Sequence, residues 1–440
     1  MKVLYILLSV VLLCLVAFFI RSKLVTKKTT SVEPFTKNSN SRDLVVVISD
    51  LHMGADLSYA EFNKNSKTLE SFLGKVRVSP NIKELVIAGD LVDEWFVPAT
   101  VDTYQGKDQA SFVKRIAQTN KDVFAAFNRI IKEKKIKVTY LPGNHDLTVT
   151  AKQIESVLPG VSQARDDVQG LGTYTPIDLP QVAIEHAHRY NFFCAPDPIS
   201  NQSVAPGTIM PPGYFFTRIA ALHVIEQCKT AGDTMPKVVP NSSGNVSQEL
   251  MYGYWQDWQF TINSFPITNK FDEKIITTNV NGFTGNYSIN DLLPFQSTPG
   301  GTIDVNLYKG IQDTWKERQK INHVAVDIPT AHAIKYVADP KESDNQAAIQ
   351  YFTNPDSNKR IVIFGHTHVA TMNESTNSAG KKTIYANSGT WIDGNPGYTT
   401  MNFVVIAPQT SDPSSQTTVK LYNLQNGTVT QMSEDSLRFE

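Results

Sequence analysis

The sequence is poor in cysteine and has no excess of either charge. Only three cysteines occur in 440 residues; Cys14 lies in an apolar run, and Cys194 and Cys228 either pair or stay as buried free thiols, which we favour. Lys and Arg number 41 against 42 Asp and Glu, so the chain lacks the basic surface of a nucleic-acid binder. A Gly-x-Ser-x-Gly elbow, a His-Glu-x-x-His helix and a Walker A loop are also absent, which excludes the enzyme classes built on them.

One long apolar run stands at the N-terminus. Val3–Ile20 carries no charge and would span ~27 Å as a helix, close to the thickness of a bilayer core. It is either an uncleaved membrane anchor or a signal peptide, and the lack of a small-x-small cleavage site favours the anchor. The positive flank at Arg21 and Lys23 argues against export. Signal anchors include exceptions to that rule, so we expect an extracytoplasmic body, secreted if the run is cleaved.

The composition divides the rest of the chain into a tether, a main domain and an insertion. Residues 1–23 form the anchor or signal, and residues 24–42 are polar and predict a flexible tether. Residues 43–440 are expected to form one large domain. Within it, residues 190–340 are long, aromatic and irregular, and we interpret them as an inserted cap. Five aromatic residues form either the core of this insertion, which we favour, or a cage for a ligand: Tyr252, Tyr254, Trp255, Trp258 and Phe260.

Strands alternate with helices before the insertion. Runs rich in β-branched residues predict buried strands, and apolar faces at helical spacing predict helices, so we expect a mainly parallel sheet covered by helices. The predicted strands are 44–48, 84–88, 136–141 and 181–185, and the predicted helices are 61–77, 109–134 and 151–158. After the insertion, a helix at 344–353 precedes strands at 361–364, 383–386, 401–406 and 419–424. This C-terminal third looks mainly antiparallel and predicts a second sheet.

Polar side chains follow five of these strands. Functional groups gather at the carboxyl ends of the strands of a parallel sheet, so we expect these side chains to meet. They are oxygen and nitrogen donors without a thiolate, which suits two divalent metal ions rather than a structural zinc site. One carboxylate must bridge two such ions, which lie ~3.5–4 Å apart. The candidates are Asp50, His52, Asp90, Asn144, His145, His186, His366 and His368.

The order of these motifs resembles the calcineurin-like metallophosphoesterase family. It runs Asp-x-His, Gly-Asp-x-x-Asp, Gly-Asn-His-Asp, His-x-His and Gly-His-x-His across residues 44–391, while the insertion matches no pattern that we can place. The resemblance implies a four-layer αββα sandwich with a long, partly helical cap. It also implies a hydrolase of phosphoric ester bonds that uses two divalent ions, which in the family are manganese, iron, zinc or nickel.

The resemblance implies a role for each position. Asp50, His52 and His368 would bind the first metal, Asp90 would bridge both, and Asn144, His186 and His366 would bind the second. His145 would contact the phosphate and assist the leaving oxygen, which suits a histidine beside a ligand. Asp146 would orient His145, although capping of the following helix explains it equally well.

Two features depart from the pattern or extend it. The fourth motif usually reads His-Gly-His, and here Ala187 separates His186 from His188; a methyl group is tolerable there unless the backbone needs a positive φ. We expect His188 to lie behind the ligands or to contact substrate. The stretch Asp93–Trp95 completes Gly-Asp-Leu-x-x-x-Trp, which is similar to the branch of the family that cleaves nucleotide-sugar lipid pyrophosphates. Its two acids fit solvated loop charges equally well.

These features predict a membrane-anchored, metal-dependent phosphoesterase. It would hydrolyse a phosphomonoester, phosphodiester or pyrophosphate by a two-metal-activated hydroxide, with His145 assisting the leaving group. Its partners would be a phosphorylated small molecule or a lipid-linked substrate, and the insertion would select among them. The alternative is a non-catalytic scaffold with the same fold, like a retromer subunit. Such scaffolds typically lack part of the histidine set, and this sequence has every ligand type.

Overall fold

The computed structural model of this chain describes residues 31–36, 41–227 and 229–439. The anchor predicted at 1–23 lies outside these residues. Among the residues that are described, no helix has both the length and the apolar character needed to cross a membrane.

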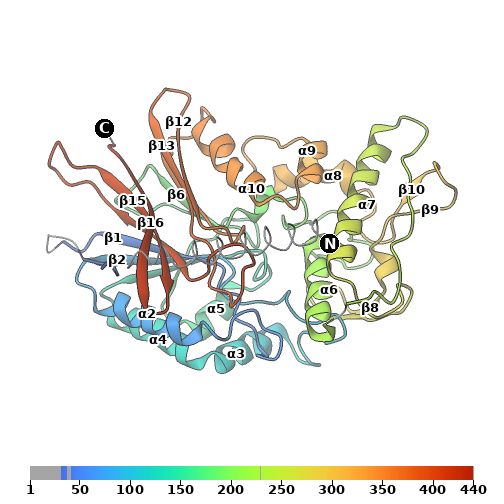
Figure 1. Cartoon of the computed structure of the whole chain (residues 1–440), viewed down its shortest axis with the longest axis horizontal. Coiled ribbons are helices and arrows are strands. Elements are labelled where there is room, and N and C mark those ends of the chain that lie inside the picture. Colours follow the sequence, from blue (N-terminus) through green and yellow to red (C-terminus); the bar gives the residue numbers. More distant parts are fainter. Residues whose placement is uncertain (1–30, 37–40, 228, 440) are drawn as a thin grey trace, which may run out of the picture.

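Two β-sheets lie face to face at the centre of the main domain, as Figure 1 shows. The seven-stranded sheet has the order β16 (Thr428–Leu437), β15 (Thr417–Gln425), β14 (Asn402–Ala407), β1 (Leu44–Ile48), β2 (Ile82–Ala88), β3 (Lys137–Leu141) and β4 (Ser162–Gln163). The five-stranded sheet has the order β12 (Thr371–Thr376), β13 (Lys382–Asn387), β11 (Ile361–Phe364), β6 (Val182–Glu185) and β5 (Thr173–Tyr174).

Alternation along β1 explains how the layers hold together. Successive side chains of a strand point to opposite faces. Val45 and Val47 belong to the apolar cluster between the two sheets, together with residues of β11 such as Ile363. Val46 and Ile48 belong instead to the cluster that includes the covering helices. Every residue of β1 is therefore buried, as expected for a strand with packing on both faces.

Helices α2, α3 and α4 cover the outer face of the seven-stranded sheet (Figure 1). The single helix predicted at 109–134 is wrong, because Asn120 interrupts it with φ −105° and ψ 33°. The Asn120 amide donates to the carbonyl oxygens of Gly54 and Ile116. The helices of this half are α2 (Ser66–Val78), α3 (Gln109–Thr119), α4 (Lys121–Glu133) and α5 (Ala151–Val157).

The C-terminal strands divide between the two sheets, which corrects part of that prediction: β11, β12 and β13 belong to the second sheet, but β14, β15 and β16 do not. β14 pairs antiparallel with β1, so the antiparallel set β14–β16 extends the first sheet. The second sheet has a parallel centre, in which β11 pairs with both β6 and β13. The prediction failed because β-branched runs identify strands but not their partners.

Residues 190–340 extend away from the sheets and carry their own helices and two small ribbons (Figure 1). Tyr254, Trp255 and Trp258 are buried as predicted, but Phe260 is 57% exposed and is not part of this core. The elements are α6 (Pro212–Glu226), α7 (Val246–Ser264), α8 (Ile311–Ile321), α9 (Thr330–Lys335), β7 (Ile276–Thr278), β8 (Gly285–Tyr287), β9 (Phe295–Gln296), β10 (Ile303–Asp304) and η2 (Ile289–Asp291). The flanking elements are η1 (His188–Tyr190), α10 (Pro340–Ala347) and η3 (Ala348–Phe352).

Arg218 on α6 joins the insertion to the loop that follows β2. Its guanidinium is fully buried and donates to the carbonyl oxygens of Val97 at 2.6 Å and Val101 at 2.6 Å. It also donates to the carbonyl oxygen of Thr277 at 2.9 Å and to the Tyr214 hydroxyl at 2.6 Å. Neutral oxygen acceptors therefore solvate this buried charge. One side chain on α6 thereby connects that helix to the loop after β2 and to β7.

Replacing Arg218 by methionine should destabilise the protein strongly. The substitution leaves several buried carbonyl oxygens without donors, so we expect the free energy of unfolding to fall by about 3 kcal/mol or more. Denaturant titration measures this. The control is Arg77→Met, which removes a guanidinium that is 38% exposed and paired with Glu133, and should change stability by less than about 1 kcal/mol. Equal effects of the two substitutions would contradict the structural role of Arg218.

Candidate metal centre

The loops that follow β1, β2, β3, β6 and β11 meet at one edge of the two sheets. Each contributes residues directly after its strand, and the two sheets together bring all the predicted ligands to one place. Groups of acidic and histidine atoms close enough to hold an ion are Asp50, His52 and His368; Asp50, Asp90 and His186; and His52, Asp93 and His145.

The first group lies around Asp50. Asp50 Oδ1 is 3.3 Å from His368 Nε2 and 3.9 Å from His52 Nε2, and the two ring nitrogens are 3.0 Å apart. All three polar ends therefore face a common point. The backbone amide of His366 donates to both Asp50 oxygens at 3.1 Å, which fixes the carboxylate.

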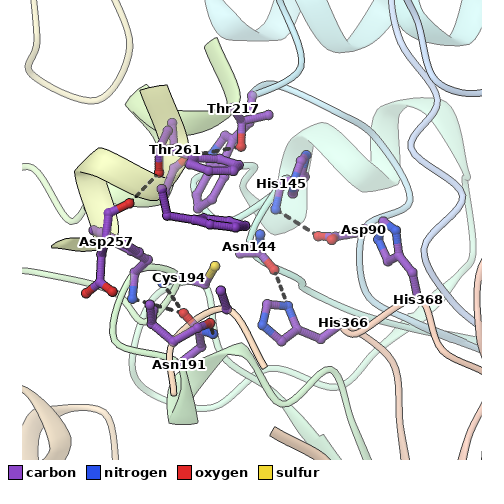
Figure 2. A pocket seen from close by; sticks show the side chains of 17 residues that line it. Asp90, Asn144, His145, Asn191, Cys194, Thr217, Asp257, Thr261, His366 and His368 are labelled. Carbon is purple, nitrogen blue, oxygen red and sulfur yellow. Dashed lines mark hydrogen bonds between the residues drawn. The ribbon is translucent and has the colours of Figure 1, made fainter. Parts of the chain in front are cut away.

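The second group lies around Asn144. Asn144 Oδ1 is 3.0 Å from His186 Nε2 and 2.9 Å from His366 Nδ1 (Figure 2). Asp90 Oδ2 lies between the groups, 3.1 Å from His186 Nε2 and 3.5 Å from His52 Nε2. This position is the one that a bridging carboxylate would need. The division into two metal-binding sets nevertheless stays a prediction.

Two glycines allow the loops to approach this closely. A Cβ atom at Gly143 would lie 2.2 Å from Asp90 Oδ1 and 2.5 Å from the Asp90 backbone nitrogen. A Cβ atom at Gly89 would lie 2.4 Å from a ring nitrogen of His186, and Gly89 also has φ +90°. Any side chain at either position would push a predicted ligand out of place.

Several of the predicted ligands adopt left-handed backbone conformations. Non-glycine residues do so rarely, at a cost of about 1–2 kcal/mol each, and such strain gathers at functional sites. The φ values are 54° for Asp50, 48° for His52, 51° for Asp90, 73° for His366 and 60° for His368. The turns thus point side chains two residues apart, such as those of His366 and His368, toward one centre. The rest of the fold must offset the free-energy cost of this backbone strain.

Buried opposite charges dominate the electrostatics. Burial alone would raise the pKa of Asp50, but His186 and the hydrogen bonds from His368 and His52 hold that pKa well below its ordinary value. Burial alone would likewise raise the pKa of Asp90, but His186, His145 and His52 together hold it below its ordinary value. Burial would lower the pKa of His186, but Asp90 and Asp50 raise it to about 9. The carboxylates therefore stay ionised and carry negative charge into a buried space, which favours cations.

His145 lies beside the centre and is oriented by Asp93. His145 Nδ1 is 2.8 Å from Asp93 Oδ1, while Asp93 Oδ2 is 2.9 Å from His52 Nδ1. Trp95 stacks on the His145 ring with centroids 5.0 Å apart. The backbone amide of His145 donates to Asp90 Oδ1 at 2.8 Å, drawn as a dashed line in Figure 2. Asp93 is buried and is not a solvated loop charge.

The role predicted for Asp146 is wrong. Its carboxylate accepts hydrogen bonds from the backbone amides of Gly143 at 2.6 Å and Leu91 at 2.8 Å, and no bond to His145 is present among these contacts. It does not cap the next helix either, because Thr150 caps α5. Asp146 thus ties the loop after β3 to the loop after β2. Its burial raises its pKa to about 6.

The fourth motif also differs from expectation. Ala187 has φ 81°, so the alanine occupies the conformation that normally favours glycine. His188 is buried, and its Nε2 lies 3.0 Å from the carbonyl oxygen of Gly170. Its ring is 5.3 Å from that of His186. His188 therefore packs behind a ligand, and the structure gives no support to the substrate contact.

A cavity of about 270 Å³ opens beside this centre, between the main domain and the insertion. Asp90, His145 and His366 form one end, and the insertion supplies much of the rest (Figure 2). Cys194 also lines it as a free thiol, whose pKa burial raises to about 12; Cys228 lies outside the described residues. Asp257 on α7 is another lining residue, and burial raises its pKa to about 8. The sequence offered no sign that Asp257 or Cys194 would line a cavity.

The residues fit the metal ions that the motifs predicted. Carboxylate, amide and imidazole donors without sulfur suit manganese, iron, zinc or nickel. Within each of the three groups named above, the ligand atoms lie within 4.8 Å of one another. Two adjoining donor groups with a carboxylate between them are typical of two-metal hydrolases.

Comparison with known families identifies the particular group. Residues 44–207 match the family of calcineurin-like phosphoesterases. This match agrees with the resemblance that the motifs carry, and over the matched segment it indicates a hydrolase acting on phosphoric ester bonds. No curated protein matches the chain. The matched segment ends before β11, so His366 and His368 lie outside it.

Gly143→Ala should weaken metal binding without unfolding the protein. The new methyl group displaces Asp90, so we expect a loss of at least tenfold in manganese affinity, the range seen when groups that support ligands are altered. Titration calorimetry on metal-stripped protein measures this. The control is Gly74→Ala in α2, where a Cβ atom meets nothing within 4 Å and alanine should stabilise the helix by up to about 1 kcal/mol. Unchanged affinity in Gly143→Ala would contradict the close packing described above.

Asp257 should make stability depend on pH. Its pKa is about 8 in the folded chain against an ordinary 3.8, so the folded protein keeps a proton that the unfolded chain releases. The free energy of unfolding should therefore fall as pH rises from about 4 to about 8. Asp257→Asn removes this loss and should be more stable than wild type at pH 9 by on the order of 3 kcal/mol, with little difference at pH 4. Chemical denaturation tests this, with the exposed Asp272→Asn as control; a pH-independent difference would refute it.

Proposed function

We propose that this chain is a membrane-anchored, metal-dependent phosphoesterase that hydrolyses a phosphomonoester, phosphodiester or pyrophosphate. The observation that carries the proposal is the meeting of seven oxygen and nitrogen donors with His145 at the mouth of a cavity. Asp50, His52 and His368 would hold one ion and Asn144, His186 and His366 the other, with Asp90 between them. Two divalent ions bound there would activate a water molecule and neutralise charge on the phosphoryl oxygens.

The protein's own contribution is proton transfer at His145. Asp93 accepts a hydrogen bond from Nδ1–H of His145, which leaves Nε2 to face the reacting group. His145 Nε2 can then donate a proton to the leaving oxygen. Trp95 holds the ring from one side, and its bulk helps to exclude water. Asp93 is thus a positioning residue, in the role that sequence reasoning gave to Asp146.

The location of the protein is part of the same proposal. The apolar run at Val3–Ile20 supports a single anchor, with the body on the extracytoplasmic side. The tether predicted at 24–42 is wrong for residues 31–36, because the Val32 amide donates to the Val429 carbonyl oxygen and Phe35 is buried in the core. The partners would be the membrane and a phosphorylated small molecule or lipid-linked substrate. The even balance of 41 basic and 42 acidic residues supports no nucleic-acid partner.

A series of leaving groups tests the role of His145. The full chain, in detergent, is stripped of metal, titrated with manganese and assayed on 4-nitrophenyl phosphate, bis(4-nitrophenyl) phosphate and phenyl phosphate. Phenol leaves poorly and needs a proton more than 4-nitrophenol does. His145→Ala should therefore lose about 10²–10⁴-fold in kcat on phenyl phosphate and distinctly less on 4-nitrophenyl phosphate.

Two further variants separate positioning from metal binding. Asp93→Asn should show the same dependence on the leaving group as His145→Ala, in weaker form, while Asp90→Asn should lose metal and both activities. Equal losses on both monoesters in His145→Ala would rule out proton donation by this residue. Bound metal without hydrolysis of any ester in wild type would favour the non-catalytic scaffold.

A further inference from the structure

The cavity begins at the residue that would protonate the leaving group. His145 lines it together with Asp90 and His366, and Trp95 continues the wall from the His145 ring. If His145 protonates the leaving oxygen, as proposed above, a phosphoryl group held by the predicted ligands would have that oxygen on the His145 side, where the cavity begins. The organic part of the substrate would therefore extend into this cavity.

The wall of the cavity away from the metal centre is mainly apolar and aromatic. The apolar side chains of this wall are Trp95, Phe193, Phe216, Phe260, Val337 and Ala338. Figure 2 shows Thr217, Thr261 and Asp257 grouped on the insertion side, across from Asn144 and His366. The volume of about 270 Å³ exceeds the ~150 Å³ that accommodates benzene and is below the ~300–1,000 Å³ typical of sites for drug-sized ligands.

The part of the cavity away from the metal centre has no basic side chain to pair with an anion. None of the residues that line it is a lysine or an arginine. Its only acid outside the predicted metal centre is Asp257, which is largely protonated at pH 7 because burial raises its pKa to about 8. A second phosphate or a carboxylate on the substrate would enter an apolar space without a counter-charge, which costs several kcal/mol.

We propose that the cavity binds the leaving group of the substrate and that this group is uncharged and mainly apolar, with the bulk of one or two aromatic rings. The inference rests on the proposed function, since it takes the metal centre to hold the phosphoryl group. It favours aryl or short-chain alkyl phosphate esters. Nucleotides and sugar phosphates with a second anionic group bind poorly.

Binding of phosphonates tests this without hydrolysis. Titration calorimetry on the full, manganese-loaded chain compares methylphosphonate, phenylphosphonate and 4-carboxyphenylphosphonate. The phenyl compound should bind at least tenfold tighter than the methyl compound, as burial of a ring predicts, and with a more negative heat-capacity change. The carboxylate should remove at least that tenfold gain.

Two exposed phenylalanines of the insertion provide a matched pair of variants. Phe260 lines the cavity and is 57% exposed, so its truncation should not disturb the core. Phe260→Ala should reduce the preference for phenyl over methyl about fivefold, and Phe260→Arg should restore binding of the carboxylate. Phe295, which is 39% exposed and lies outside this cavity, is the control, and Phe295→Ala should keep the wild-type preference.

The outcomes separate the inference from the function on which it rests. Equal binding of methylphosphonate and phenylphosphonate, together with hydrolysis of small esters, would overturn the inference and leave the phosphoesterase intact. Tighter binding of the carboxylate would overturn it as well. No phosphonate binding and no ester hydrolysis by the manganese-loaded chain would overturn the proposed function and this inference with it.

Discussion

The structure depends on holding buried carboxylates close together at the edge of two sheets. Asp50 and Asp90 are almost fully buried, and each approaches histidine nitrogens from other strands. This is possible only because Gly143 and Gly365 leave room, since a Cβ atom at either would lie within 3 Å of one of these carboxylates. Such a concentration of charge is unfavourable in the absence of cations, and the sheets on both sides must supply the stability that offsets it.

The insertion and the main domain together form the side of the site where His145 and the cavity lie. Asp93 and Trp95 belong to the loop after β2, and Arg218 on α6 holds the continuation of that loop through backbone carbonyl oxygens. The same insertion supplies most of the apolar wall of the cavity. A change in the insertion can therefore alter both the space for the leaving group and the orientation of His145, without touching a metal ligand.

Apolar runs predicted the central strands of both sheets, and the motifs that follow them predicted the residues that meet at the strand ends. This worked because buried strands are plain in the sequence and parallel strands bring their ends together. The predictions that failed depended on the direction of a side chain or on the partner of a strand, and neither can be read from the local sequence. Asp146 is adjacent to His145 in the chain yet points to backbone amides, whereas Asp93 reaches the ring from another loop. Similarly, the sequence of β14 predicts a strand, but no feature of that sequence indicates that the strand pairs with β1.

The pairing of β6 with β11 determines when the metal site can assemble during translation. These neighbouring strands are in parallel register, with Val182 opposite Ile361, although the whole insertion lies between them in the chain. A ribosome that has just released β6 presents Asp50, Asp90 and His186, but not His366 or His368. Domains generally fold as units during translation, from the N-terminus onward. A metal ion that met this nascent chain would find five of the seven predicted ligands, and the set would be complete only after β11 and the loop that follows it had emerged.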